Sequence, residues 1–141
     1  MTGLEEIDST QGIKPMESGR YIQMVLVSGS KLFLKGMSAL LKDEVENIKI
    51  TSLTSYQEIG KYVPKLKPEI LFLDNTTLKQ EAQKLLSFVV NKSPSTNIIL
   101  FSPFLIDRIN LPNITFLGKD ANSSKLINII KSIGLKHRRE N

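Results

Sequence analysis

The residues of this chain that could do chemistry are few and lie far apart in the sequence. They are a carboxylate at Asp74, small polar residues at Ser28–Ser30, a hydroxyl at Ser102 and an ammonium at Lys119. A carboxylate near hydroxyls and an ammonium can accept a group, bind a cation or hold an anion. The chain has no cysteine, and its single histidine, His137, lies in a basic terminus. A disulfide framework, a thiolate metal site and a histidine-based triad or metal site are therefore excluded.

Each of these residues follows a short run of apolar and branched residues, which is the pattern of a strand buried on both faces. Five such runs predict β-strands at Ile22–Val27, Ile48–Leu53, Glu69–Asp74, Asn97–Ser102 and Ile114–Leu117.

Segments with helical periodicity lie between most of these strands. Apolar residues recur at spacings of three and four within Leu32–Leu41, Leu78–Val90 and Ser123–Leu135. A further helix is predicted after Ser55, whose capping box with Glu58 marks its start, and two prolines bracket its end.

This alternation predicts an α/β fold with a doubly wound, five-stranded parallel sheet that helices cover on both faces. The strands of such a sheet end at one edge, where ligands collect. We therefore expect Ser28, Gly29, Asp74, Ser102 and Lys119 to meet there.

Several segments resemble the receiver domains of LuxR/NarL-type response regulators, the transcription regulators of bacterial two-component systems. The first strand and helix resemble the opening of those domains in the segment VLVSGSKLFLKGMSALL, and the third strand does so in ILFLD. The resemblance places Asp74 at the phospho-accepting position and Ser102 at the hydroxyl that contacts the phosphoryl group. The segment FLGKDANSSKLINIIKSI resembles the last strand and helix, with Lys119 at the family's lysine and Phe116 at its aromatic switch position. The likeness covers about residues 21–135 and implies a receiver, flavodoxin-like fold.

The chain departs from that family directly after the first strand. Receivers carry two acidic residues there, and this chain has Ser28 and Gly29. A Mg²⁺ ion that bridges to a phosphoryl group needs carboxylate oxygens, and Asp74 alone supplies one such ligand. Asp43 and Glu44 fall at the far end of the predicted first helix. We expect a degenerate phospho-acceptor pocket with no metal and no cofactor, that is, an atypical receiver.

A second departure lies between the fourth and fifth strands. The stretch SPFLIDRINLPN contains two prolines and little helical periodicity, and it is shorter than its counterpart in the family. The resemblance thus implies a shortened fourth helix. Activated receivers of this type signal or dimerise partly through that helix, so we expect a rebuilt signalling surface.

Several of these residues also have a simpler, purely structural interpretation. Asp74 is expected to pair with Lys119, which would hold the site in one arrangement. Phe116 is expected to be a packed core aromatic rather than a moving switch. Ser28–Ser30 is expected to be a connecting turn; the alternative is an anion-binding loop for a flavin phosphate or another anionic ligand.

Chain length, net charge and the distribution of apolar residues limit the domain organisation and the location of the protein. A chain of 141 residues is long enough for one domain, here residues 21–135, preceded by a flexible leader at 1–20 and followed by a basic tail or linker at 136–141. The net charge of +5 comes from scattered lysines and the terminal cluster, which is typical of a solvated surface rather than of a nucleic-acid site. No apolar run of about 20 residues and no secretion signal is present, which predicts a cytoplasmic protein without membrane contact.

The leading hypothesis is a phosphorylation-independent regulatory domain of a bacterial transcription regulator, without enzymatic activity, that acts as a homodimer or by docking on a partner protein. Contact with DNA would then require a C-terminal helix-turn-helix domain that this chain does not contain. Three alternatives stay open: a stand-alone adaptor, a small-molecule or flavodoxin-like binder, and a conventional receiver that accepts phosphate at Asp74.

Overall fold

The computed structural model describes residues 21–75, 82–102, 113–118 and 121–139. Within them the chain forms one five-stranded sheet with the strand order β2-β1-β3-β4-β5, and every neighbouring pair is parallel. The strands are β1 (Ile22–Val27), β2 (Ile48–Leu53), β3 (Ile70–Asp74), β4 (Asn97–Phe101) and β5 (Ile114–Leu117). The helices are α1 (Lys31–Glu44), α2 (Tyr56–Leu66), α4 (Ala82–Lys92) and α5 (Ser123–Arg139).

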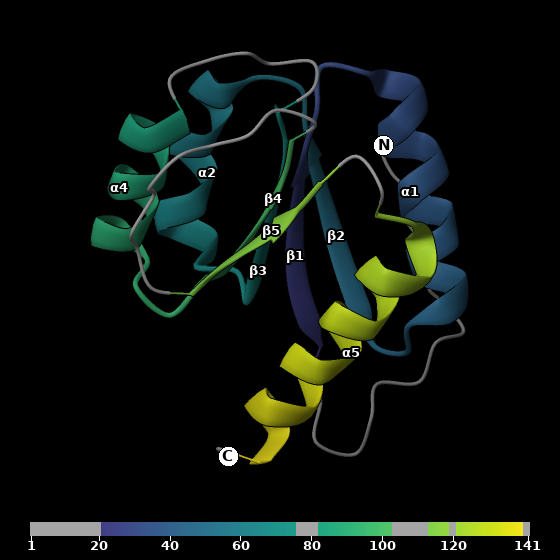
Figure 1. Cartoon of the computed structure of the whole chain (residues 1–141). Helices are drawn as coiled ribbons and strands as arrows, with labels where there is room; N and C mark the ends of the chain where they lie inside the picture. Colours follow the sequence, from purple (N-terminus) through teal and green to yellow (C-terminus); the bar gives the residue numbers. More distant parts are fainter. Residues whose placement is uncertain (1–20, 76–81, 103–112, 119–120, 140–141) are drawn as a thin grey trace.

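The sheet is covered on both faces, as a doubly wound fold requires. Figure 1 shows α1 and α5 on one face and α2 and α4 on the other. Side chains alternate between two separate cores, because successive residues of a strand point to opposite faces. In β1, Met24 and Leu26 pack in the core under α1 and α5, whereas Val25 and Val27 pack in the core under α2 and α4. The predicted fold class is confirmed.

Aromatic packing strengthens the core under α1 and α5. Phe72 of β3 is almost fully buried, and its ring stacks against Phe33 of α1 at 5.9 Å and Phe101 of β4 at 6.3 Å between centroids. Such pairs contribute about 0.5–1.5 kcal/mol beyond the burial of apolar area. They hold the start of α1 against β3 and β4, whose ends carry the candidate site.

The predicted strands match the observed ones to within one residue at each end. At the start of α2, Ser55 is the N-cap, but its side chain makes no capping hydrogen bond. Glu58 instead accepts hydrogen bonds from the backbone N–H of Thr54 at 2.8 Å and from its hydroxyl at 3.3 Å. The predicted capping box is therefore displaced by one residue. The helix also runs past Pro64 and ends where Lys67 adopts a left-handed conformation, with φ at 44°.

The last helix is longer than predicted. It continues past Leu135 to Arg139, so the basic residues assigned to a tail belong partly to α5. Lysine and arginine are good helix formers, and cations near the C-terminus interact favourably with the helix dipole. The predicted leader (1–20), the start of the third predicted helix and the shortened fourth helix between β4 and β5 lie outside the described residues. None of the helices in the described ranges is both long and apolar enough to cross a membrane.

A glycine sets how closely α5 approaches the sheet. A Cβ atom on Gly134 would lie 2.7 Å from Cδ1 and 3.5 Å from Cγ1 of Ile22, whereas a Cβ on Gly36 of α1 would meet nothing within 4 Å. We expect Gly134→Val to lower the free energy of unfolding by about 1–3 kcal/mol, because the branched side chain must displace Ile22 from the core. The matched change Gly36→Val should alter it by less than about 0.5 kcal/mol. Urea denaturation measures both, and equal effects would contradict the close approach.

Candidate functional site

Three predicted site residues lie at the carboxyl edge of the sheet, and all three are buried. Ser28 follows β1 and is 0% exposed, Asp74 ends β3 and is 2% exposed, and Ser102 follows β4 and is 6% exposed. The parallel register brings them together, because β1 and β4 both pair with the central strand β3.

The central contact is a hydrogen bond from the Ser28 hydroxyl to Oδ2 of Asp74, with 2.7 Å between the oxygens. A buried carboxylate without hydrogen-bond partners would be costly, and a bond to a charged acceptor is among the stronger kinds. The Ser28 oxygen also accepts the backbone N–H of Ser30 at 3.0 Å. Because a hydroxyl has a single proton, the donor of Ser28 is committed to Asp74.

Ser30 ends the connection between β1 and α1. Its side-chain oxygen accepts the backbone N–H of Phe33 at 3.1 Å, so Ser30 is the N-cap of α1. Ser28, Gly29 and Ser30 thus connect strand to helix, with Ser28 buried and Gly29 exposed. This is the geometry of the predicted connecting turn.

A second chain of hydrogen bonds crosses the same edge, and sequence reasoning missed it. The Tyr56 hydroxyl donates to Oδ1 of Asn75 at 3.0 Å, and Nδ2 of Asn75 donates to the Ser102 hydroxyl at 3.5 Å. Asn75 directly follows Asp74, and Tyr56 opens the helix after β2. A signal for Asn75 was available in the sequence, because it directly follows a strand that ends in a carboxylate, whereas Tyr56 lies three residues beyond the end of β2 and carried no such signal.

The surroundings of Tyr56, including the charge of Asp74, change its pKa. Burial of the phenol, and secondly the negative charge of Asp74, raise the pKa of Tyr56 from 10.0 to about 12. Both effects disfavour the phenolate. Tyr56 therefore remains a protonated hydrogen-bond donor to Asn75 throughout the physiological pH range.

The predictions for Lys119 and Phe116 remain to be compared with the structure. Lys119 lies outside the described residues, so its pairing with Asp74 stays a prediction. Phe116 is 45% exposed, and the expectation that it packs in the core is wrong. The reason is its place in the sheet: β5 is an edge strand, and α2 and α4 pack mainly on the inner strands of that face.

The carboxylates of the described residues do not fit a divalent-cation site. Nowhere in the described ranges do three His, Cys, Asp or Glu side chains gather closely enough to hold a metal ion. Ser28 and Gly29 bring no carboxylate to Asp74, while Asp43 and Glu44 lie at the C-terminal end of α1. Within the described residues, the two positions after β1 therefore offer a Mg²⁺ ion none of the carboxylate oxygens that two acids would supply there.

Comparison with known proteins identifies the fold. No family model matches the chain, and no curated protein matches it. It is similar to the structure of a response regulator receiver domain protein from Bacillus halodurans, with a TM-score of 0.70 and 14% identity over 81% of this chain and 97% of that one. A signal receiver domain of an HD domain-containing protein from Pseudomonas fluorescens gives a TM-score of 0.71 and 16% identity over 86% and 100% of the two chains.

A longer protein also matches. The chain is similar to RcsB from Salmonella enterica, in a structure bound to the rprA promoter, with a TM-score of 0.65 and 13% identity over 82% of this chain and 62% of that one. At these identities, the three likenesses show a shared receiver fold.

The Tyr56 pKa provides a test of the site geometry. In a background with Tyr21→Phe and Tyr62→Phe, Tyr56 is the one tyrosine left to titrate. We expect Asp74→Asn to lower its pKa from about 12 toward 10, because the substitution removes a negative charge that opposes phenolate formation. The pKa should stay above 10, because burial is the larger cause. Phenolate absorbance measured against pH gives the pKa of Tyr56. An unchanged pKa would show that Asp74 lies too far from Tyr56 to affect it.

Removal of the Ser28 hydroxyl tests the central hydrogen bond. We expect Ser28→Ala to lower the free energy of unfolding by about 1.5–3 kcal/mol at neutral pH, because a buried carboxylate loses a donor. Ser124→Ala, at an exposed position of α5, is the control and should have little effect. In an Asp74→Ala background the Ser28 substitution should cost much less. A cost that is the same in both backgrounds would show that Ser28 and Asp74 are not coupled.

Proposed function

We propose that this chain is a phosphorylation-independent regulatory domain with a receiver fold, which acts by binding another protein chain and not by catalysis. The single observation that carries the proposal is the 2.7 Å hydrogen bond from Ser28 to the buried Asp74 carboxylate. A neutral hydroxyl stands where receivers place an acid, and it is already bonded to the residue that would accept the phosphoryl group.

The electrostatics support this view. Transfer of a phosphoryl group to a carboxylate brings negative charges together, and catalysis requires that positive charge or a metal ion compensate them. Ser28 contributes one hydrogen bond to Asp74 and no ligand charge for a cation. The residues described around Asp74 therefore favour a stable, unmodified carboxylate.

Burial supports it as well. Asp74 is 2% exposed, and Ser28 and Ser102 beside it are buried too. The hydrogen bond between Tyr56 and Asn75 joins α2 to the end of β3 at the same edge. A phosphoryl donor would have to open these contacts before it could reach the carboxylate.

A domain of this kind would regulate through its surface. The output would be a homodimer or a complex with a partner protein, in line with an atypical receiver of a transcription regulator in a two-component system. RcsB, which shares the fold, has been seen bound to a promoter. Any DNA contact of the present protein would be made through a separate C-terminal domain.

The test is exposure to a small phosphoryl donor. Incubation of the wild-type chain with Mg²⁺ and acetyl phosphate should leave its intact mass unchanged, because Ser28 and Gly29 supply no carboxylate to hold the Mg²⁺ that would compensate the incoming charge. The reference is Asp74→Ala, and an active receiver treated in parallel shows that the donor works. A phosphoryl adduct on the wild type that is absent from Asp74→Ala would refute phosphorylation independence.

A variant that introduces Mg²⁺ ligands after β1 provides a second test. Ser28→Asp combined with Gly29→Asp restores two carboxylates after β1, and Mg²⁺ binding should then become measurable by calorimetry. The matched variant Ser28→Asn with Gly29→Asn has nearly the same shape without the charges and should bind no Mg²⁺. Equal Mg²⁺ affinity of the wild type and the acidic variant would contradict the role assigned to Ser28.

A further inference from the structure

A groove of about 310 Å³ lies at the amino edge of the sheet, the edge opposite to Asp74. It is bounded by the start of β1, the end of α1 and the C-terminal part of α5, which Figure 1 shows at the same end of the molecule. Ile22, Val45 and Leu135 form its apolar part, and Leu135 is 54% exposed. A single exposed leucine is ordinary, but here it continues the apolar surface of a groove.

Two features hold this groove in shape. The backbone N–H of Ile22 donates to the carbonyl of Asn47 at 2.7 Å, which ties the start of β1 to the turn after α1. Gly134 lines the groove from α5, and a Cβ atom there would lie 2.7 Å from Cδ1 of Ile22. Because its walls are fixed by the fold, the groove itself loses little freedom when it is filled.

The rim of the groove is charged. Glu44, Glu46 and Lys131 line it and are exposed, so two carboxylates and one ammonium give the rim a formal charge of −1 (−2 + 1). Contacts with exposed charges contribute modestly and are screened by salt. The rim therefore favours an apolar occupant that carries a cation over one that carries acids.

The chain itself supplies a segment next to the groove. Tyr21 directly precedes Ile22, so residues 1–20 join the domain at the wall of the groove. A segment tethered this closely has an effective concentration of about 1 mM, and a contact with a Kd of about 1 mM is then substantially occupied. A separate chain would need a larger surface, because stable interfaces bury about 1,200–2,000 Å².

Charge and spacing select one part of this leader. Apolar residues recur every three positions within residues 1–7 and again at Ile13 and Met16. The first set is interspersed with acidic residues, whereas Lys14 lies within the second. Pro15 favours an extended conformation at Lys14, and three residues complete a turn of a polyproline II helix, so Ile13 and Met16 can face the same way.

We propose that the groove binds the segment Ile13–Met16 of the chain's own leader. The side chains of Ile13 and Met16 fill the groove and cover Leu135, while Lys14 lies beside the carboxylates of the rim. The volume suits roughly two apolar side chains, since a cavity of about 150 Å³ holds a benzene molecule. The five residue steps from Met16 to Tyr21 span up to about 17 Å, which is enough to reach the groove.

The leader is then partly ordered on the domain, in contrast to the flexible segment that its composition predicts. It joins the start of β1 to the ends of α1 and α5. This inference does not rest on the proposed function, and the outcome of the acetyl phosphate experiment leaves it unaffected.

A spin label in the leader tests the contact. The chain has no cysteine, so Gln11→Cys places a nitroxide at one position, just before the docked segment. In the ¹⁵N-labelled full chain, the label should broaden the amide signals of Val45 and Leu135 more than that of Ser93, which follows α4 on the other face of the sheet. Equal broadening at the three amides, as expected of an undocked leader, overturns the proposal.

Matched substitutions test the apolar part of the contact. Leu135→Asp should abolish the stronger broadening at Val45, because it puts a carboxylate into the groove. Leu32→Asp changes another exposed leucine, 83% exposed at the start of α1, and should leave the broadening as it is. Within the leader, Met16→Asp should release the segment and Ile7→Asp should not. Equal effects of the two substitutions in either pair overturn the proposal.

A charge exchange tests the place of Lys14. Lys14→Glu and Glu46→Lys should each lower the ratio of docked to undocked leader about two- to fivefold at low salt, and less at high salt. The combined variant restores opposite charges and should lie closer to the wild type than either single variant. Additive losses in the combined variant overturn the pairing by which the segment was chosen.

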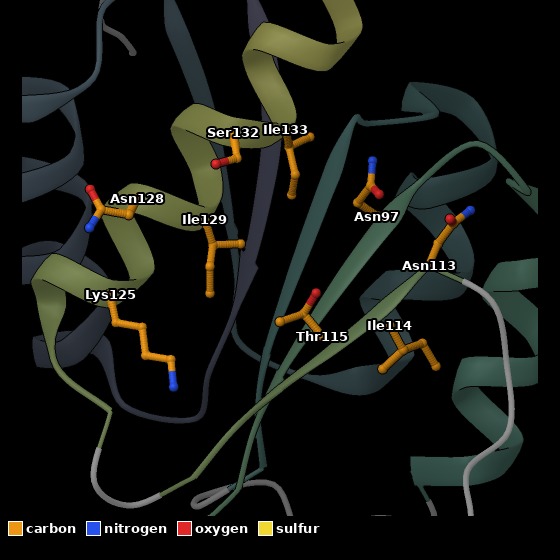
Figure 2. A pocket seen from close by; sticks show the side chains of 9 residues that line it. All are labelled: Asn97, Asn113, Ile114, Thr115, Lys125, Asn128, Ile129, Ser132 and Ile133. Atoms are coloured by element: carbon orange, nitrogen blue, oxygen red, sulfur yellow. The ribbon is translucent and has the colours of Figure 1, made fainter.

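Two outcomes would assign the leader elsewhere. A mixture of spin-labelled ¹⁴N chain and unlabelled ¹⁵N chain should show no broadening at Leu135, and broadening there overturns the proposal in favour of the leader of a second copy. A larger groove lies between α5 and the strands β4 and β5 (Figure 2). Stronger broadening at Thr115 and Asn128, which line that groove, than at Val45 would also overturn the proposal.

Discussion

The arrangement of the candidate site depends on a carboxylate that is buried and must be satisfied by the protein itself. Asp74 ends the central strand β3, where neighbouring strands and helices leave it 2% exposed. The Ser28 hydroxyl donates to it at 2.7 Å, and the same oxygen accepts the N–H of Ser30, the residue that caps α1. One side chain thereby links the end of β1, the end of β3 and the start of α1. In receivers an acid and a metal ion would stand at this place; here a neutral hydroxyl does so.

The sheet positions this contact through its two cores. β1 and β3 are neighbours and send alternate side chains into the two cores, so a slip of one residue would move every apolar side chain to the opposite core and disrupt the packing there. That constraint fixes Ser28 and Asp74 opposite each other although 46 residues separate them. Tyr56 and Asn75 join the same edge from α2 and β3. A packed framework therefore holds the buried contact between Ser28 and Asp74 in place.

In contrast to the buried contact between Ser28 and Asp74, the strand β5 is partly exposed. Among the described strands, β5 lies at the margin of the sheet and pairs with β4 alone, and it leaves Phe116 exposed. A groove lined by both polar residues and isoleucines lies between it and α5.

The sequence by itself determined the order of strands and helices, the parallel α/β architecture and the end of each strand to within one residue, because these follow from local periodicity. It also predicted that Ser28, Asp74 and Ser102 would share an edge, since parallel strands end together. The tertiary structure decided the hydrogen bond from Ser28 to Asp74, the chain from Tyr56 through Asn75 to Ser102, and the exposure of Phe116. These depend on register and side-chain rotamers, which packing between distant segments sets. The length of α5 also escaped prediction, because basic residues read as a tail are equally good helix formers.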